Sequence, residues 1–488
     1  MTIDENLYRV LADVDHQREF IITGDQTLTY GKVFEMAARF AASMAGLGVG
    51  PGDRVVVQVS KSVDALALYL GCLQLGAVQV PLNTAYTPAE VGYFVDDSEP
   101  SLVVLDPGSP QPTADHTCAM VDLGELARLA DQAQASEQVT SRGGRDLAMM
   151  LYTSGTTGRS KGAMLSHAAL IANGRGLNQI WGFRPDDTLV HILPIFHVHG
   201  LFVALHSAML SGARVEYFDR FDVDQTIDAL ARSTVMMGVP THYTRLMASP
   251  RLDPDACSSM RLFTSGSAPM TAQVHEEFTA RTRHQIVERY GMTECGIITS
   301  NPLDGNRVPG TVGFALPHTE IRVTRDGEVV EAGEAGIVEV RGPGLFDGYW
   351  RLPDKTAEEM RPGGWFVTGD VGHTSADGRL TLEGRAGDMI ISGGYNIYPK
   401  EIELVLDEVP GIAESAVIGV PHPDFGEAVV AVVAGAWDEA SVRPALDQHL
   451  ARFKHPRHHI QLENLPRNAM GKVQKAALRE QYRHLFSD

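Results

Sequence analysis

Cysteine is scarce in this sequence: there are four in 488 residues. They lie far apart, and no two of them have the C-x-x-C spacing that metal sites and redox motifs use. The sequence therefore predicts neither a disulfide framework nor a zinc site built on cysteine.

Basic residues are also in the minority. The chain has 41 lysines and arginines against 61 aspartates and glutamates, which gives a formal net charge of −20. Nucleic acids and anionic membranes are bound by broad surfaces rich in Lys and Arg, so this charge balance argues against both classes of partner. A small anionic ligand remains compatible, because a local cluster of hydrogen-bond donors can hold it within an acidic protein.

Long uninterrupted apolar runs are missing as well. The most apolar stretches are broken by Gln74 and Gln79, or by His197 and His199, so we expect no membrane span. The first residues, MTIDENLYRV, include acidic side chains and lack the basic-then-apolar order of a secretory signal. We therefore expect a cytoplasmic protein.

The order of apolar and polar residues predicts two kinds of domain. The larger part alternates between β-branched runs, such as RVVVQVS, and helical stretches, such as SVDALALYLGCLQLG. This alternation is typical of an α/β fold with mainly parallel sheets flanked by helices. Beyond a glycine-rich stretch the pattern changes. We predict a large N-terminal part of several subdomains, residues 1–386, and a small mobile α+β C-terminal domain, residues 387–488.

One short stretch is rich in Gly, Ser and Thr. It reads LYTSGTTGRSKGAMLSH and overlaps the end of a strand-like run, LAMMLY. The backbone N–H groups and hydroxyls of such a loop can wrap a polyphosphate, although an ordinary surface turn is the alternative. The Walker spacing is absent, so a nucleotide would be held outside the P-loop fold. The candidate phosphate ligands are Thr153, Ser154, Gly155, Thr156, Thr157, Gly158 and Lys161.

A second cluster, ERYGMTECG, combines acidic, basic and aromatic residues. Glu294 could hold Mg²⁺ against phosphate oxygens, and Tyr290 could lie on a nucleotide base. The alternative is an ordinary strand and turn in which Glu288 and Arg289 form an ion pair.

Three weaker signals lie elsewhere in the chain. In WFVTGD, Asp370 is predicted to follow a tight turn, where it could accept hydrogen bonds from both ribose hydroxyls. In LPRNAMGKVQK, Lys472 could reach a phosphate, although such lysines are more often solvated. In PIFHVHG, the spacing of His197 and His199 predicts that both lie on one face of a strand, as a metal pair or as core histidines.

Taken in order, these motifs resemble those of a known superfamily. YTSGTTGRSKGAMLSH, RYGMTE, TGD, GRAGDMIISGGYNIYPKEIE and PRNAMGK resemble the acyl- and aryl-CoA synthetases, luciferases and peptide-synthetase adenylation domains. The resemblance implies an enzyme that uses ATP, Mg²⁺ and coenzyme A. A substrate carboxylate attacks the α-phosphorus, pyrophosphate leaves, and the CoA thiol then attacks the acyl-adenylate. Such catalysis rests on positioning and charge neutralisation rather than on covalent chemistry by the protein.

The resemblance also implies roles for individual residues. Lys472 is expected to reach the carboxylate and the α-phosphate, Glu294 and Thr153 to hold Mg²⁺, and Asp370 to hold the ribose. With Lys472 and Glu294, His197 is expected to act in catalysis. The neighbouring motif residues expected to contact ATP, some of them around the adenine, are Ser267, Ala268, Pro269, Glu288, Tyr290, Gly291, Met292, Thr293 and Arg385.

Two further expectations concern the second half-reaction. Coenzyme A is expected to bind at Gly393, Gly394 and Tyr395. The small domain of this superfamily rotates about a hinge that is often Asp or Lys, and the corresponding residue here is Gly387, followed by Asp388. Glycine absorbs a large backbone change readily, but a side-chain anchor that steadies one state is expected to be missing.

The identity of the acid is predicted from the segments expected to line the acyl pocket. They contain His197, His199, Arg245, Ser265 and Arg289. Several cations or donors in one pocket are costly unless an anion pairs with them, so a small dicarboxylic acid is expected. PLNTAYT, LPIFHVHGLF, GVPTHYTRL, SNPLDGNRVPG and GVPHPDFGE also resemble malonyl-CoA synthetases, which implies malonate or methylmalonate.

Two other functions stay open at this point. One is a CoA ligase for a different short-chain or aromatic acid. The other is a non-catalytic nucleotide-binding protein, which would be expected to lose Lys472, Glu294 or Asp370, and all three are present.

Overall fold

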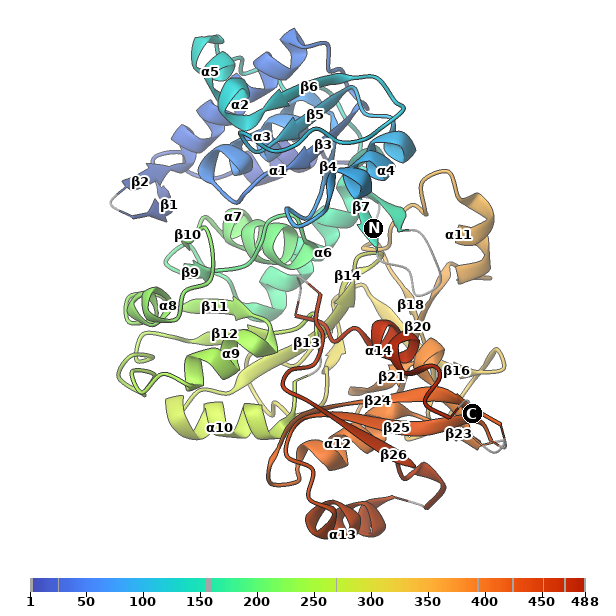
Figure 1. Ribbon diagram of the computed structural model, residues 1–488. Helices are drawn as coiled ribbons and strands as arrows, with labels where there is room; N and C mark the ends of the chain where they lie inside the picture. Colours follow the sequence, from blue (N-terminus) through green and yellow to red (C-terminus); the bar gives the residue numbers. More distant parts are fainter. Residues whose placement is uncertain are drawn as a thin grey trace.

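The structure is a computed structural model that describes residues 3–24, 26–153, 160–268, 270–392, 395–423, 425–450, 452–468 and 471–486. The strands described there form four sheets. In Figure 1 the sheet whose strands lie within residues 54–166 is above a nine-stranded sheet, and the C-terminal part lies below and to the right.

The sheet formed within residues 54–166 is mainly parallel. Its strand order is β6-β5-β3-β4-β7-β8, with β7 and β8 antiparallel to each other. Its strands are β3 (Arg54–Gln58), β4 (Val78–Pro81), β5 (Leu102–Leu105), β6 (Ala119–Asp122), β7 (Leu147–Thr153) and β8 (Lys161–Ser166). The helices of this region are α2 (Tyr30–Gly46), α3 (Val63–Leu75), α4 (Pro88–Ser98) and α5 (Leu123–Gln132). β5 is buried at every residue, as in a parallel strand that is covered on both faces.

The nine-stranded sheet has the order β15-β14-β13-β12-β11-β9-β10-β1-β2. Its strands are β1 (Glu19–Thr23), β2 (Gln26–Thr29), β9 (Thr188–His191), β10 (Arg214–Tyr217), β11 (Val235–Gly238), β12 (Leu262–Ser265), β13 (Ile286–Met292), β14 (Gly296–Ser300) and β15 (Phe314–Ala315). The helices are α1 (Leu7–Ala12), α6 (His167–Trp181), the π-helix η1 (His199–His206), α7 (Ser207–Ser211), α8 (Val223–Leu230), α9 (Pro240–Met247) and α10 (Ala272–Thr282).

Local sequence signals explain where several helices begin and end. Thr87 and Glu90 form a capping box at the start of α4, in which each side chain bonds the backbone of the other residue. Ser62 caps the start of α3, and Gly76 ends it in the left-handed conformation that glycine adopts readily.

An antiparallel sheet follows, which the sequence reading did not anticipate. Its order is β17-β16-β18-β20-β19, with β21 paired to β20. Its elements are β16 (Glu320–Arg325), β17 (Glu328–Val329), β18 (Gly336–Arg341), α11 (Pro353–Glu359), β19 (Met360–Arg361), β20 (Trp365–Thr374) and β21 (Leu380–Arg385). Asp370 lies within β20, so the expectation that it follows a tight turn is wrong.

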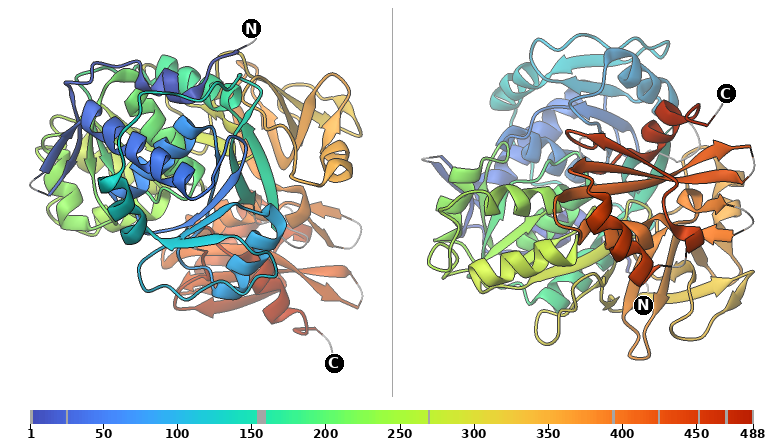
Figure 2. Two further views of the ribbon diagram at one scale, coloured as in Figure 1. Left: turned by 90° about the horizontal axis from the view of Figure 1, so that it is seen from above. Right: turned by 60° about the horizontal axis from the view of Figure 1, so that its bottom comes forward.

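The C-terminal elements form a small α+β unit with its own buried clusters. They are η2 (Ala386–Asp388), β22 (Ile390–Ser392), β23 (Tyr395–Ile397), α12 (Pro399–Asp407), β24 (Ile412–His422), β25 (Gly426–Gly435), α13 (Glu439–His449), η3 (Arg452–Lys454), β26 (His458–Leu462) and α14 (Lys475–Tyr482). In Figure 2 this orange and red part lies against the rest of the chain. The predicted fold class is confirmed.

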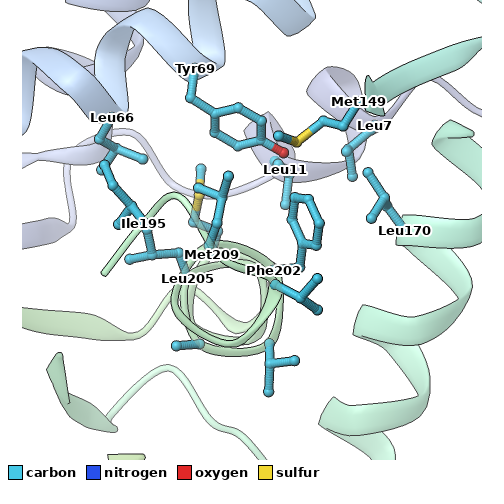
Figure 3. Packing of buried hydrophobic residues seen from close by; sticks show 14 of the residues in the cluster. Leu7, Leu11, Leu66, Tyr69, Met149, Leu170, Ile195, Phe202, Leu205 and Met209 are labelled. Carbon is cyan, nitrogen blue, oxygen red and sulfur yellow. The ribbon is translucent and has the colours of Figure 1, made fainter. Parts of the chain in front are cut away.

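The main hydrophobic core joins the two large sheets. Tyr69 of α3 packs with Phe202 and Leu205 of η1 and with Leu170 of α6, and all four are buried (Figure 3). η1 is thereby held rigidly from two sides, which matters because the first residue of η1 is His199. None of the helices in the described residues is long and apolar enough to span a bilayer.

Candidate active site

Polar residues gather at one edge of the nine-stranded sheet. β9, β11 and β12 are parallel, so their carboxyl ends share that edge. Open α/β sheets bind ligands beyond the carboxyl ends of their strands. His197 follows β9, Ser265 ends β12, and Arg289 lies on the adjacent β13.

Arg289 is a buried cation that has no ionic partner among the residues described. It is 6% exposed, and among the residues described neither its Nε nor its Nη2 has a hydrogen-bond partner. Burial lowers the pKa of Arg289 to about 9. Neighbouring strand residues point to opposite faces, and Glu288 instead accepts a hydrogen bond from the Gly310 N–H at 3.0 Å. Burial raises the pKa of Glu288 to about 8. The described part of the chain therefore contains no Glu288–Arg289 pair.

Two neutral imidazoles lie near this cation. Burial, followed by the charge of Arg289, lowers the pKa of His197 to about 3 and holds the pKa of His199 well below its usual range. The backbone N–H of His199 donates a hydrogen bond to Nδ1 of His197 at 3.2 Å. Nδ1 of the His199 ring lies 3.3 Å from Oγ of Ser267. The two histidines are not on a strand as their spacing predicted, because His199 opens η1. Within the described residues, His199 Nε2 and Ser265 Oγ lack partners.

Asp370 lies at the centre of a second group, which the sequence assigned to the ribose. It is 6% exposed and accepts a hydrogen bond from the Tyr290 hydroxyl. Its Oδ1 lies 2.7 Å from Nε of Arg385, at the end of β21. Three predicted ATP residues from distant segments are thus brought into direct contact.

Glu294 belongs to a network that sequence reasoning missed. The hydroxyl of Tyr349 lies 3.0 Å from Glu294 and 2.7 Å from Glu359. Lys161 pairs with Glu359 at 3.1 Å and lies 4.1 Å from the ring centre of Tyr349. Burial raises the pKa of Glu294. Tyr349 and Glu359 carried no motif signal, because each is brought to the site only by the path of the chain around α11.

The turn between β13 and β14 carries Glu294 into the site. Gly291 and Met292 end β13, and Thr293 precedes Glu294 in the turn. A Cβ on Gly291 would lie 2.2 Å from the Gly296 carbonyl oxygen, so the close approach of the two strands requires glycine there. Thr153 pairs with Lys161 across β7 and β8, at the end of that hairpin where the two strands are connected.

Lys472 reaches this site from the C-terminal part. Its N–H donates to Oδ1 of Asn468 at 3.0 Å, and Gly471 before it has a positive φ of 75°. The residue keeps some solvent-exposed surface, but the protein packed around its ammonium group, followed by the charge of Arg385, lowers the pKa of Lys472. The carboxylates of Asp370 and Glu294 oppose this shift. A Cβ on Gly471 would lie 3.3 Å from Oγ1 of Thr241 in α9, so this turn docks on the N-terminal part.

The predicted hinge region holds an ion pair that the sequence did not suggest. Gly387 in η2 has open space around its Cα. Oδ1 of Asp388 lies 2.7 Å from Nη2 of Arg479 in α14. Both residues belong to the C-terminal part, so this pair does not link the two units, and the missing side-chain anchor at Gly387 stays a prediction.

Some predicted residues are not brought to this site. Arg245 is exposed and its guanidinium lies 4.7 Å from the ring centre of Phe221, so we leave it out of the anion site. Ala268 is in the described turn after Ser267, and Tyr395 is described by its backbone alone. The predicted residues outside the described ranges are Ser154, Gly155, Thr156, Thr157, Gly158, Pro269, Gly393 and Gly394.

The fold and this site define an adenylating enzyme, and the chain belongs to the AMP-binding enzyme family. The family model of the AMP-binding enzymes matches residues 9–350, and that of the AMP-binding enzyme C-terminal domain matches residues 401–472. The predicted superfamily is thereby confirmed. Within the family the protein is an ATP-dependent acid–CoA ligase.

Its relatives act on different acids. Indoleacetate–CoA ligase of Aromatoleum aromaticum is 34% identical over 93% of both chains. Malonate–CoA ligase of Arabidopsis thaliana is 33% identical over 89% of this chain and 79% of its own. The solved structure of ATP-bound MatB from Rhodopseudomonas palustris is 46% identical, with a TM-score of 0.95 over 99% of this chain and 100% of its own. The acid must therefore be argued from the site.

Proposed function

We propose that the acid is malonate, which the enzyme joins to coenzyme A while ATP is split to AMP and pyrophosphate. The observation that carries the proposal is Arg289, a buried cation with two guanidinium nitrogens unpartnered among the described residues. A buried charge without a partner costs several kcal/mol, which an anionic ligand offsets. Malonate presents one carboxylate for activation and a second for Arg289.

The space beside the site favours a short acid. A cavity of about 10 Å³ lined by residues that include Val198, Phe202 and Thr293 has room for about one water molecule. An indole ring in this space would need the buried side chains of Val198 and Phe202 to move. A space of this size is compatible with a short acid such as malonate or methylmalonate.

In the proposed first half-reaction, a malonate carboxylate oxygen attacks the α-phosphorus of ATP. The bond from that phosphorus to the bridging oxygen breaks, and pyrophosphate leaves. Lys472 neutralises the charge that develops on the α-phosphate, and Asp370, held by Arg385, accepts from the ribose. Nδ1 of His197 accepts a hydrogen bond from the backbone N–H of His199, so the neutral ring carries its proton on Nε2. This Nε2–H can donate a hydrogen bond to the acid.

Glu294 and Thr153 fit the expected Mg²⁺ ion. Glu294 is 5% exposed, and burial raises its pKa although its own backbone, the Tyr349 hydroxyl and the charge of Arg385 act in the opposite direction. The described residues contain no cluster of three His, Cys, Asp or Glu ligands. Mg²⁺ typically binds one or two carboxylates together with substrate phosphates, and it would supply neutralisation of the phosphate charge here.

In the proposed second half-reaction, the CoA sulfur attacks the acyl carbonyl, AMP leaves, and the thiol proton passes to solvent. We propose that Lys472 serves adenylation from its position near Asp370 and Arg385, so the small domain must first rotate. We propose Gly387 as its pivot and Gly393, Gly394 and Tyr395 as CoA contacts, with residues 1–386 and 387–488 as the two moving units.

A panel of acids tests the proposal. Malonate, methylmalonate, propionate, acetate and indoleacetate are each incubated with enzyme, ATP, Mg²⁺ and CoA, and AMP is quantified. We expect malonate to give the highest kcat/KM by at least about tenfold over propionate. Exchange of labelled pyrophosphate into ATP without CoA identifies the adenylate route. Preference for a monocarboxylate would overturn the assignment of malonate.

A further inference from the structure

The guanidinium of Arg289 occupies space that a side chain at position 266 would need. A Cβ on Gly266 would lie 2.4 Å from Cζ, 2.5 Å from Nε and 2.6 Å from Nη1 of Arg289. Real carbon and nitrogen atoms do not approach this closely without repulsion. The arginine and a side chain at 266 are therefore mutually exclusive in this geometry.

The backbone does not explain the glycine. Gly266 is not among the residues with a positive φ, so an L-residue meets no conformational penalty there. The next residue, Ser267, does have a positive φ of 69°, and its Oγ lies 3.3 Å from Nδ1 of His199. The turn thus places the Ser267 hydroxyl beside the imidazole of His199, and Gly266, which has no side chain, beside the guanidinium of Arg289.

The other surroundings of Arg289 are rigid. Tyr243 is fully buried, acts electrostatically on Arg289, and is fixed by a 2.6 Å hydrogen bond from its hydroxyl to the Thr264 carbonyl oxygen. The strand of Arg289, β13, is itself held between β12 and β14. The clash of a Cβ at position 266 would therefore be relieved by movement of the Arg289 guanidinium, while the backbone stays in place.

We propose that Gly266 is a positioning residue required for a dicarboxylic acid: its missing side chain leaves the space in which Arg289 meets the second carboxylate. A residue with a Cβ at this position would displace the guanidinium and leave an enzyme for monocarboxylates. This inference rests on the proposed function of Arg289. It adds a specificity residue that itself contributes no charge and no hydrogen-bonding side chain.

The test compares Gly266→Ala with the unmodified enzyme on malonate and propionate. We expect kcat/KM for malonate to fall by roughly 10–100-fold, because the carboxylate contact is misaligned rather than deleted. Propionate activity and KM for ATP are expected to stay within about twofold. Gly46→Ala is the matched control, since Gly46 has no heavy atom within 4 Å of an added Cβ and no positive φ.

A double variant separates action through Arg289 from a structural effect. In an Arg289→Ala background, Gly266→Ala should cost malonate activity almost nothing further, because the group it displaces is gone. Equal losses with malonate and propionate, or an undiminished loss in the Arg289→Ala background, would overturn the inference. If the unmodified enzyme does not prefer malonate, the proposed function fails. If it does and Gly266→Ala retains that preference, this inference alone fails.

Discussion

Replacing Arg289 with alanine should separate malonate activity from all other properties of the enzyme. Arg289 is 6% exposed and lacks partners at Nε and Nη2 among the described residues, so the bound dicarboxylate would be its counter-ion. Deleting one member of a buried, hydrogen-bonded ion pair costs about 3–4 kcal/mol, or roughly 10²–10³-fold in kcat/KM for malonate. Propionate has no second carboxylate and should lose less than about threefold.

Stability provides the second half of this experiment. Without ligand, the buried charge of Arg289 has no partner at Nε or Nη2 among the described residues, so its removal relieves desolvation while it leaves a cavity. We expect the Tm of the free variant to stay within a few degrees of the unmodified protein. Malonate should raise the Tm of the unmodified enzyme by ligand binding and should fail to raise that of the variant.

The reasoning has a clear point of failure. If Arg289→Ala lowers malonate and propionate activity by the same factor, Arg289 serves ATP or the fold. A large fall in Tm without ligand would point to a structural ion pair. Arg289→Lys keeps the charge but loses the bidentate fork, and it should recover only part of the malonate activity.

Three other perturbations test different parts of the structure. Lys472→Ala should lower pyrophosphate exchange by at least about 100-fold and spare thioester formation from supplied acyl-adenylate, and equal losses would refute that division. Thr241→Trp should obstruct the docked turn at Gly471 and give the same half-reaction pattern more weakly, whereas unchanged exchange would mean that the contact is incidental. Glu288→Gln should raise Tm more at pH 8 than at pH 5. The folded pKa of Glu288 is raised to about 8, so the stability present below the unfolded pKa of about 4.5 is lost as pH rises through 8, and glutamine avoids this loss. A Tm difference independent of pH would contradict it.

The sequence allowed the parallel sheets and the helices around them to be predicted. Runs such as residues 54–60 alternate with capped helices, and local preference and burial agree there. The antiparallel sheet from β16 to β21 was missed in part because β16 and the two-residue β17, with much exposed surface, carry no strong period. His197 and His199 were placed on a strand because a spacing of two fits one, whereas tertiary packing of the apolar residues that follow forms η1.

The site was predictable where a motif residue does its own chemistry. Asp370, Tyr290 and Arg385 were named separately, and the structure brings them into contact. Partners supplied by the path of the chain could not be found, such as Tyr349 beside Glu294 or Thr241 beside Gly471. Gly266 lay in a motif, yet a missing side chain gains meaning only when the atoms that fill its space are known.

The Asp388–Arg479 pair has a mechanical consequence for the proposed rotation. The pair joins the first residue after Gly387 to α14, the last helix, so the beginning and the end of the small domain are linked. A rotation of the backbone at Gly387 would therefore move Asp388 and α14 together. The path that Lys472 follows would then be set by the φ and ψ angles of Gly387.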